Sequence, residues 1–379
     1  MDVAILALED GAAFVGRPFG ARGETDGEVV FNTSTTGHRG IVDDPANRGL
    51  IVVMTCSDVG DFDDDRGDRR PWLRGFVAPG ASPRGVNRRA EESLSAYLAD
   101  RGVVGLTGID ARALARHLRV HGSMKGVVSS IEADDAVLIA RARDARGVDG
   151  LDLTGEVMPA AATVWAPGPA RSYRVAPLGG ERLDPEDEKR PRVVVLDFGM
   201  RRDAPGRLVD LGLIVTVVSG RIAPEAVMEH QPDGVFLSDG PGDPSALGDV
   251  AASVRTLVKA AAESRGVPIL GVGLGCQLLG MAFGARTLKL KFGHRGASVP
   301  VRDLAAGKVA ITNQNHGFAI DPSTLPGDVA PSHVNLNDGT LEGLRHQRLP
   351  IVGVQFHPES AVGSHDNQHV FDDFRAAVG

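Results

Sequence analysis

The chain has 379 residues, of which 42% are hydrophobic and 24% are charged, and its formal net charge is −8. This length and apolar content predict two domains, each with enough material for its own core. The negative charge argues against nucleic acid or an anionic membrane surface as a partner, because both attract a basic face.

The chain also shows no sign of export. Cys56 and Cys276 are its only cysteines, so no disulfide framework is indicated and a reducing compartment is expected. The first ten residues, MDVAILALED, lack the basic region and the long apolar stretch of a signal peptide. No segment approaches the roughly 20 apolar residues of a membrane helix. We therefore expect a cytoplasmic protein that does not span a membrane.

The N-terminal part reads as a small mixed α/β domain over residues 1–150. Short alternating strands are expected at residues 3–8, 28–32 and 50–55. A helix is expected at residues 110–120, with Asp110 at the capping position after Gly108. Pattern alone assigns no role to this domain.

Residues 151–191 are expected to connect the two domains. They lose periodicity and contain WAPGP at 165–169, LGG at 178–180 and a charged run at 185–192. Proline, glycine and charge in such density are more typical of linkers than of packed elements.

Residues 192–379 alternate between apolar strands and helices. Strands are expected at residues 193–196, 213–218, 234–237 and 268–272, with helices ending near 211, starting at Pro224 and covering 249–264. This alternation predicts a doubly wound parallel sheet, hence an α/β fold, whose ligands bind beyond the carboxyl ends of the strands. Glycine-rich loops at residues 240 and 271 follow two of these strands.

Residues 271–277 read GVGLGCQ between an apolar strand and an apolar helix at residues 276–283. A strand, a tight turn and a helix are the setting of a nucleophile elbow. Gly273 stands where the nucleophile would be, so the setting is present without the reactive side chain.

Over nearly its whole length the chain resembles the small subunit of carbamoyl phosphate synthetase, whose C-terminal half is a class I glutamine amidotransferase. The matching segments are GEVVFNTS at 27–34, SDGPGDP at 238–244, the elbow, QNHGF at 314–318 and QFHPE at 355–359. In that family the elbow reads G-x-C-x-G-H-Q. Here the cysteine is replaced by Gly273 and the histidine by Cys276.

The resemblance implies roles for individual residues. His357 and Glu359 match the catalytic histidine and its orienting carboxylate, which manage the proton of the nucleophile. The backbone N–H groups of Gly242 and Leu274 match the oxyanion donors. The substrate-binding positions that match are Gly240, Gly242, Leu274, Gln277, Asn315, Gly317 and Phe318.

Four positions depart from the family pattern around this one pocket. Besides Gly273 and Cys276, a serine that would contact glutamine is Ala46, and an asparagine before the oxyanion loop is Asp239. The added carboxylate should oppose negative charge at an oxyanion site. We therefore expect glutamine binding to be weakened and hydrolysis to be lost, while glycine at the strained turn keeps the fold intact.

Three functions remain in consideration. The first is a small subunit that binds the large subunit of the synthetase but supports only ammonia-dependent synthesis of carbamoyl phosphate, for arginine and pyrimidine synthesis. The second is an active glutaminase in which Cys276, near a helix N-terminus that can lower a thiol pKa, replaces the nucleophile. The third is a non-catalytic glutamine-binding or regulatory protein. No cofactor or metal is expected in this chain, and the resemblance places ATP and Mg²⁺ on the large subunit.

Overall fold

The computed structural model describes residues 3–60, 70–82, 93–168, 173–178, 189–359 and 365–379. The chain divides into two compact units, which are treated separately below. Unit 1 comprises Met1–Leu151 and Leu290–Ala297, and unit 2 comprises Asp152–Lys289 and Ser298–Gly379.

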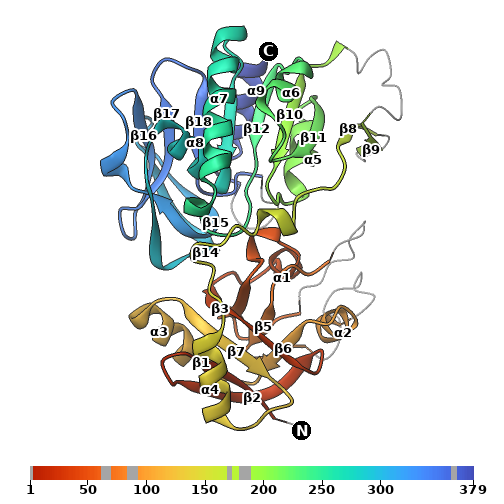
Figure 1. The fold of residues 1–379 in the computed structure, drawn as a ribbon, viewed down its shortest axis with the longest axis vertical. Coiled ribbons are helices and arrows are strands. Elements are labelled where there is room, and N and C mark those ends of the chain that lie inside the picture. The colour runs from red at the N-terminus through yellow and green to blue at the C-terminus, as the bar shows by residue number, and fades with distance from the viewer. Residues whose placement is uncertain (1–2, 61–69, 83–92, 169–172, 179–188, 360–364) are drawn as a thin grey trace. The chain divides into compact units, whose positions relative to one another are not determined.

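Unit 1 is built on a closed barrel with the strand order β1-β2-β6-β5-β4-β3-β7 (Figure 1). Closure leaves no open strand edge, because β7 pairs antiparallel with both β1 and β3. The elements are β1 (Ala4–Leu8), β2 (Ala13–Gly20), β3 (Glu24–Asn32), α1 (His38–Val42), η1 (Pro45–Asn47), β4 (Leu50–Met54), β5 (Gly75–Ala78), α2 (Leu94–Asp100), β6 (Val104–Thr107), α3 (Ala111–His121), β7 (Met124–Ser129) and α4 (Asp135–Asp144).

The helix expected at residues 110–120 is confirmed as α3. The side chain of Asp110 accepts a hydrogen bond of 2.8 Å from the backbone N–H of Ala113, so it caps the helix as predicted. Leu114 and Leu118, four positions apart and hence on one face, are fully buried in the same core cluster as β1, β3 and β4. One apolar stripe thus fixes the helix on the barrel.

Unit 2 contains a sheet whose central strands run parallel in the order β18-β13-β12-β10-β11. This confirms the predicted doubly wound α/β fold. Its elements are η2 (Thr154–Glu156), β8 (Thr163–Pro167), β9 (Tyr173–Pro177), β10 (Arg192–Asp197), α5 (Asp203–Asp210), β11 (Ile214–Ser219), α6 (Pro224–Glu229), β12 (Gly234–Leu237), η5 (Pro244–Ala246), α7 (Gly248–Ser264), β13 (Ile269–Val272), α8 (Leu274–Phe283), β14 (Thr287–Asp303), β15 (Val309–Ile320), η6 (Pro322–Thr324), β16 (Val329–Asn335), β17 (Leu341–His346), β18 (Ile351–Val354) and α9 (His369–Val378).

The two faces of this sheet carry separate cores. Side chains alternate along β10, so Val194 and Leu196 pack with α6, α7 and α8, whereas Val193 and Val195 pack with α5 and α9. A strand buried on both faces must be apolar throughout, which explains its continuous run of valine and leucine.

The stretch expected to be a connector, residues 151–191, contributes two strands to this sheet. β8 pairs antiparallel with β11, and β9 pairs antiparallel with β8. Pairing covers the edge of β11, which would otherwise expose unpaired backbone groups.

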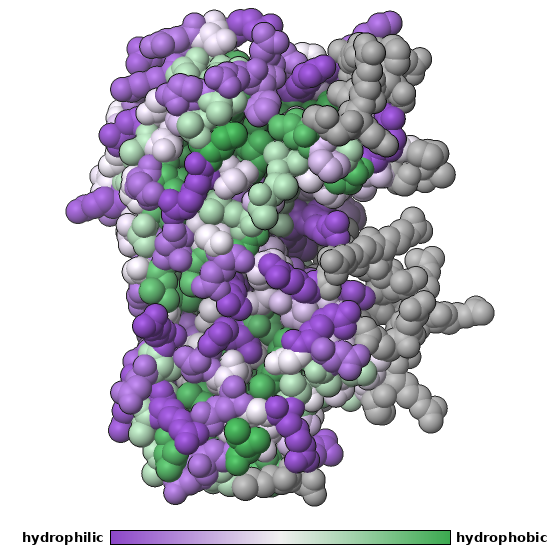
Figure 2. All heavy atoms as spheres, turned by 45° about the vertical axis from the view of Figure 1, so that its right-hand side comes forward, coloured by the Kyte–Doolittle hydropathy of each residue, from purple (hydrophilic) through white to green (hydrophobic). Residues whose placement is uncertain are grey.

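On the face drawn in Figure 2, hydrophilic side chains predominate, with apolar ones between them. Among the described residues, no helix is both long and apolar enough to cross a membrane.

Candidate active site

The elbow lies where β13 ends and α8 begins. Gly273 has φ 56° and ψ −117°, a backbone conformation that glycine adopts without the strain a side chain would bring. Its N–H donates a hydrogen bond of 2.9 Å to the carbonyl of Val354 on the neighbouring strand β18. A Cβ on Gly275 would lie 2.2 Å from the carbonyl oxygen of Leu237, so α8 packs directly on the backbone of β12. The glycines of this segment therefore set both the turn and the position of the helix.

His357 and Glu359 come together just beyond β18. Parallel pairing of Val272 with Val354 brings the carboxyl ends of β13 and β18 to the same edge of the sheet. His357 Nδ1 donates to Glu359 Oε1 at 2.9 Å, and both side chains are buried. The hydrogen bond fixes the ring so that Nε2 is the remaining nitrogen, as in a catalytic triad.

Asp239 enters the same site from the loop after β12. Its Oδ2 lies 3.4 Å from His357 Nε2, and its Oδ1 accepts a hydrogen bond of 2.8 Å from the backbone N–H of Leu274. One carboxylate thus contacts both the histidine and an amide predicted to be an oxyanion donor.

The Asp239 carboxylate also fills the space beside Gly273. A Cβ built on Gly273 would lie 2.2 Å from Asp239 Oδ1, 2.4 Å from its Cγ and 2.9 Å from its Cβ. Real Cβ atoms do not approach other heavy atoms so closely. The carboxylate therefore stands where a side chain at position 273 would begin.

The charges of the site favour an imidazolium. Burial lowers the pKa of His357, but the charge of Glu359, the hydrogen bond to it and the charge of Asp239 outweigh burial and raise the pKa to about 9. Arg201 acts in the opposite direction. Burial by itself would raise the pKa of Glu359. The charge of His357, the hydrogen bond to His357 and the charge of Arg201 act in the opposite direction and outweigh burial, so the pKa of Glu359 is lowered. At neutral pH the site holds a cation between two carboxylates.

The loop carrying the other expected oxyanion donor approaches its neighbours closely. Gly242 has φ 98° and forms an isolated β-bridge with Asp152. A Cβ on Gly240 would lie 2.4 Å from the carbonyl oxygen of Phe198. The close contact with Phe198 favours glycine at 240, and the positive φ favours glycine at 242.

Of the expected substrate-binding residues on β15 and α8, Phe318 and Gln277 are buried, whereas Asn315 and Gly317 are half-buried. Asn315, Gly317 and Phe318 share strand β15. The carboxamide nitrogen of Gln277, which is 4% exposed, donates to the carbonyl of Phe318 at 2.8 Å and to Gln355 Oε1 at 3.0 Å. Both hydrogens of this nitrogen are therefore used within the protein.

The two remaining positions are Ala46 and Cys276. Ala46 belongs to η1 of unit 1, and its predicted place in the glutamine pocket stays a prediction. Cys276 is 1% exposed and packs with Ile320, Leu341 and other apolar side chains. Burial, with a smaller contribution from Glu342, raises the pKa of its thiol. The expected lowering by the helix N-terminus does not prevail, because the thiol points into the core.

Two features of the site escape the sequence patterns. Arg201, which follows β10, acts electrostatically on both His357 and Glu359, and its side chain is only 11% exposed. Its place after a parallel strand is the one signal that could have drawn attention to it. The substitution at Asp239 is visible in the sequence, but its occupation of the space beside Gly273 is not.

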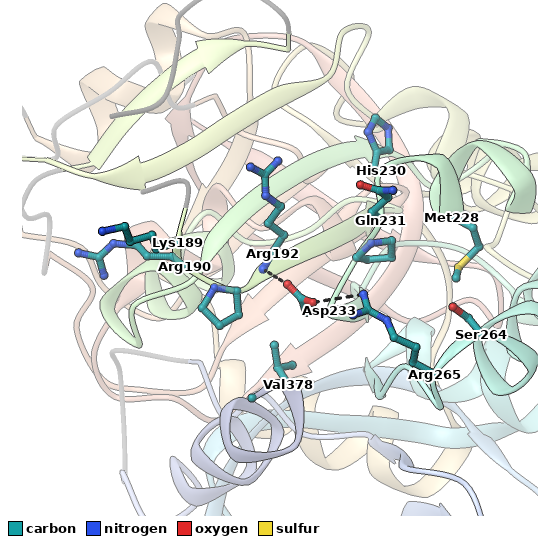
Figure 3. A pocket seen from close by; sticks show the side chains of 13 residues that line it. Lys189, Arg190, Arg192, Met228, His230, Gln231, Asp233, Ser264, Arg265 and Val378 are labelled. Carbon is teal, nitrogen blue, oxygen red and sulfur yellow. Dashed lines mark hydrogen bonds and ion pairs between the residues drawn. The ribbon is translucent and has the colours of Figure 1, made fainter. Parts of the chain in front are cut away.

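A cavity of about 1010 Å³ lies at the opposite end of the strands (Figure 3). Its lining includes Arg192, the first residue of β10, and Asp233, which precedes β12. Asp233 accepts from the backbone N–H of Arg192 at 2.9 Å and lies 3.6 Å from a guanidinium nitrogen of Arg265. Ligands of doubly wound folds bind at the carboxyl ends instead, so we assign this cavity no part in the site.

A doubly wound sheet with an elbow turn and a buried His–Glu pair beyond adjacent strands defines a domain of the class I glutamine amidotransferase type. The family model "Glutamine amidotransferase class-I" matches residues 194–377, and "Carbamoyl-phosphate synthase small chain, CPSase domain" matches residues 6–128.

Curated relatives match both units together. The carbamoyl phosphate synthase small chain of Aquifex aeolicus is 46% identical over 377 residues, covering 98% of this chain and 97% of the relative. The small chains of Rhodopirellula baltica and Syntrophotalea carbinolica are 45% and 43% identical over 377 residues, covering 98% of this chain and 95% and 96% of those proteins. The chain belongs to the carbamoyl phosphate synthase small chain family. Membership of the small-chain family implies that this chain has a large-subunit partner.

Proposed function

We propose that this chain is a carbamoyl phosphate synthase small subunit that binds the large subunit but does not hydrolyse glutamine. The observation that carries the proposal is glycine at position 273 of the elbow, where the family resemblance calls for a cysteine. Removing the nucleophile of a triad that acts as a unit costs on the order of a million-fold in rate, or about 8 kcal/mol. The complex would then make carbamoyl phosphate from ammonia.

The geometry opposes a substitute nucleophile at Cys276. The thiolate is the reactive form of cysteine, and burial disfavours it here. A Cβ on Gly353 of β18 would lie 2.8 Å from the Cys276 sulfur, which shows how closely the thiol packs on the sheet. A thiol in this place lacks the access that attack on a carboxamide requires.

The polar groups of the pocket also favour loss of hydrolysis. The N–H of Leu274 is engaged by Asp239, so it is not presented to an oxyanion. A developing negative charge would lie against the Asp239 carboxylate, which repels it. Glutamine could still enter, but its binding would be weakened.

The remaining parts of the proposal follow from family membership. Unit 1 would dock on the large subunit, where ATP and Mg²⁺ would act, and this chain would carry no cofactor of its own. The product would serve arginine and pyrimidine synthesis in the cytoplasm. The domain at residues 1–150 would dock on the large subunit, and the domain at residues 192–379 would be the amidotransferase-like domain.

The test is carbamoyl phosphate formation by this chain with its cognate large subunit, with glutamine or ammonium as nitrogen source. Ammonium should support synthesis. With glutamine, the complex should make no more carbamoyl phosphate than the large subunit alone makes with the same glutamine stock. This comparison controls for ammonia that contaminates the glutamine. A family member with cysteine at the elbow is the positive control.

Glutamine-driven synthesis by the wild-type complex would overturn the proposal. A Cys276→Ala variant then identifies the source of the activity. If that variant abolishes synthesis from glutamine while synthesis from ammonium persists, Cys276 is the nucleophile.

A further inference from the structure

We propose that Asp239 is a built-in anion in the place of the absent nucleophile, and that position 273 accepts an ionised side chain only when position 239 is neutral. This inference deepens the proposed function and rests on it. It makes Gly273 and Asp239 one interdependent pair, although they are far apart in the sequence.

Three contacts of a single carboxylate support the inference. Asp239 Oδ1 accepts the N–H of Leu274 at 2.8 Å, and Oδ2 lies 3.4 Å from His357 Nε2. The same Oδ1 would be 2.2 Å from a Cβ on Gly273. The Asp239 carboxylate therefore occupies the space of a side chain at position 273, lies against His357 and accepts the hydrogen bond of the Leu274 N–H.

The surroundings explain why an anion suits this place. His357 is buried, and two carboxylates, Glu359 and Asp239, face it, with Arg201 as the opposing charge. Buried charges must be paired. In a cysteine-dependent site a thiolate would pair with the imidazolium. Here Asp239 supplies that negative charge, so the site remains electrostatically complete without a thiol.

A side chain added at 273 would disturb this arrangement. The added atom would lie 2.2 Å from Oδ1 and 2.4 Å from Cγ of Asp239, so the carboxyl group would have to rotate away. The Cβ of Asp239, at 2.9 Å, does not move with that rotation, so the backbone would have to shift slightly as well. Rotation would separate a buried carboxylate from the Leu274 amide and from His357. Asparagine at 239 could move at lower cost, because it carries no charge that must stay paired.

Charge adds a second barrier to a cysteine at position 273. A thiolate there would lie beside a carboxylate, and like charges raise the pKa of a thiol. With asparagine at 239 this repulsion is absent, while the His357 imidazolium still favours the thiolate. The two positions should therefore be coupled both in packing and in ionisation.

The experiment compares Gly273→Cys with the double variant Gly273→Cys/Asp239→Asn. Both are treated with iodoacetamide at pH 7, and the alkylation of residue 273 is followed by tandem mass spectrometry. Residue 273 shares a tryptic peptide with Cys276, so the fragment ions that separate these two positions are the ones compared. We expect alkylation at least about tenfold faster in the double variant, since one pKa unit changes the thiolate fraction tenfold. We also expect the double variant to melt at a higher temperature than the single variant. Equal rates and equal melting temperatures would overturn the inference.

A second measurement needs no change at position 273. In Asp239→Asn alone, the pKa of His357, read by NMR titration of the labelled ring, should fall below its wild-type value while Glu359 remains in place. An unchanged pKa would overturn the inference even if the cysteine variants fail to fold. Glutamine hydrolysis by the wild-type complex would instead refute the proposed function, so the two failures are distinguishable.

Discussion

The charge arrangement around His357 predicts that the stability of unit 2 depends on pH. We consider His357→Gln, which removes the cation but keeps a polar side chain of similar reach. In the wild type the imidazolium lies between Glu359 at 2.9 Å and Asp239 at 3.4 Å. The variant leaves two buried carboxylates without their shared cation and should lower the free energy of unfolding by about 3–5 kcal/mol at pH 6.

Stability should fall as pH rises, because folding raises the pKa of His357. The pKa of His357 rises from an ordinary value of 6.5 to about 9 on folding, so its stabilisation is complete below pH 6.5 and is lost as pH rises through 9. This rise corresponds to about 3 kcal/mol. Wild-type unit 2 should lose about that much stability between pH 6 and pH 9.5, and His357→Gln should not.

The assay can be confined to unit 2. The chain has two tryptophans, Trp72 in unit 1 and Trp165 on β8 in unit 2, so Trp72→Phe leaves a probe of unit 2 alone. Urea unfolding is followed by fluorescence at several pH values in this background. Asp239→Asn, which removes one of the two anions, should show an intermediate pH dependence. A constant difference between wild type and His357→Gln at every pH would refute the reasoning.

Two further predictions concern packing and capping. Gly275→Ala should lower the stability of unit 2 by about 2 kcal/mol or more, because its Cβ would meet the backbone of β12. The control is Gly248→Ala, which has nothing within 4 Å of its Cβ and should be neutral or stabilising. Urea midpoints of the two variants test this prediction, and equal midpoints would contradict it. Asp110→Ala removes the cap on the N–H of Ala113 and should lower the stability of unit 1 by about 1 kcal/mol, measured with the tryptophan of that unit, whereas Asp110→Asn, which keeps a capping oxygen, should restore most of it.

Much of the fold follows from local patterns. The cap at Asp110, the proline that begins α6 and the continuous apolar run of β10 each act over a few residues. Such signals need no knowledge of distant contacts. The pairing of β8 and β9 with the sheet edge could not be predicted in this way, because it depends on a strand about fifty residues away.

The candidate site divides in the same manner. The sequence by itself determined that Gly273 occupies the elbow and that His357 and Glu359 follow an apolar strand. Only the tertiary structure decided that Asp239 fills the space beside Gly273, because adjacent parallel strands β12 and β13 bring their carboxyl ends together. It also decided that Cys276 faces the apolar core, since burial and charge depend on every element packed around a side chain rather than on its neighbours in the chain.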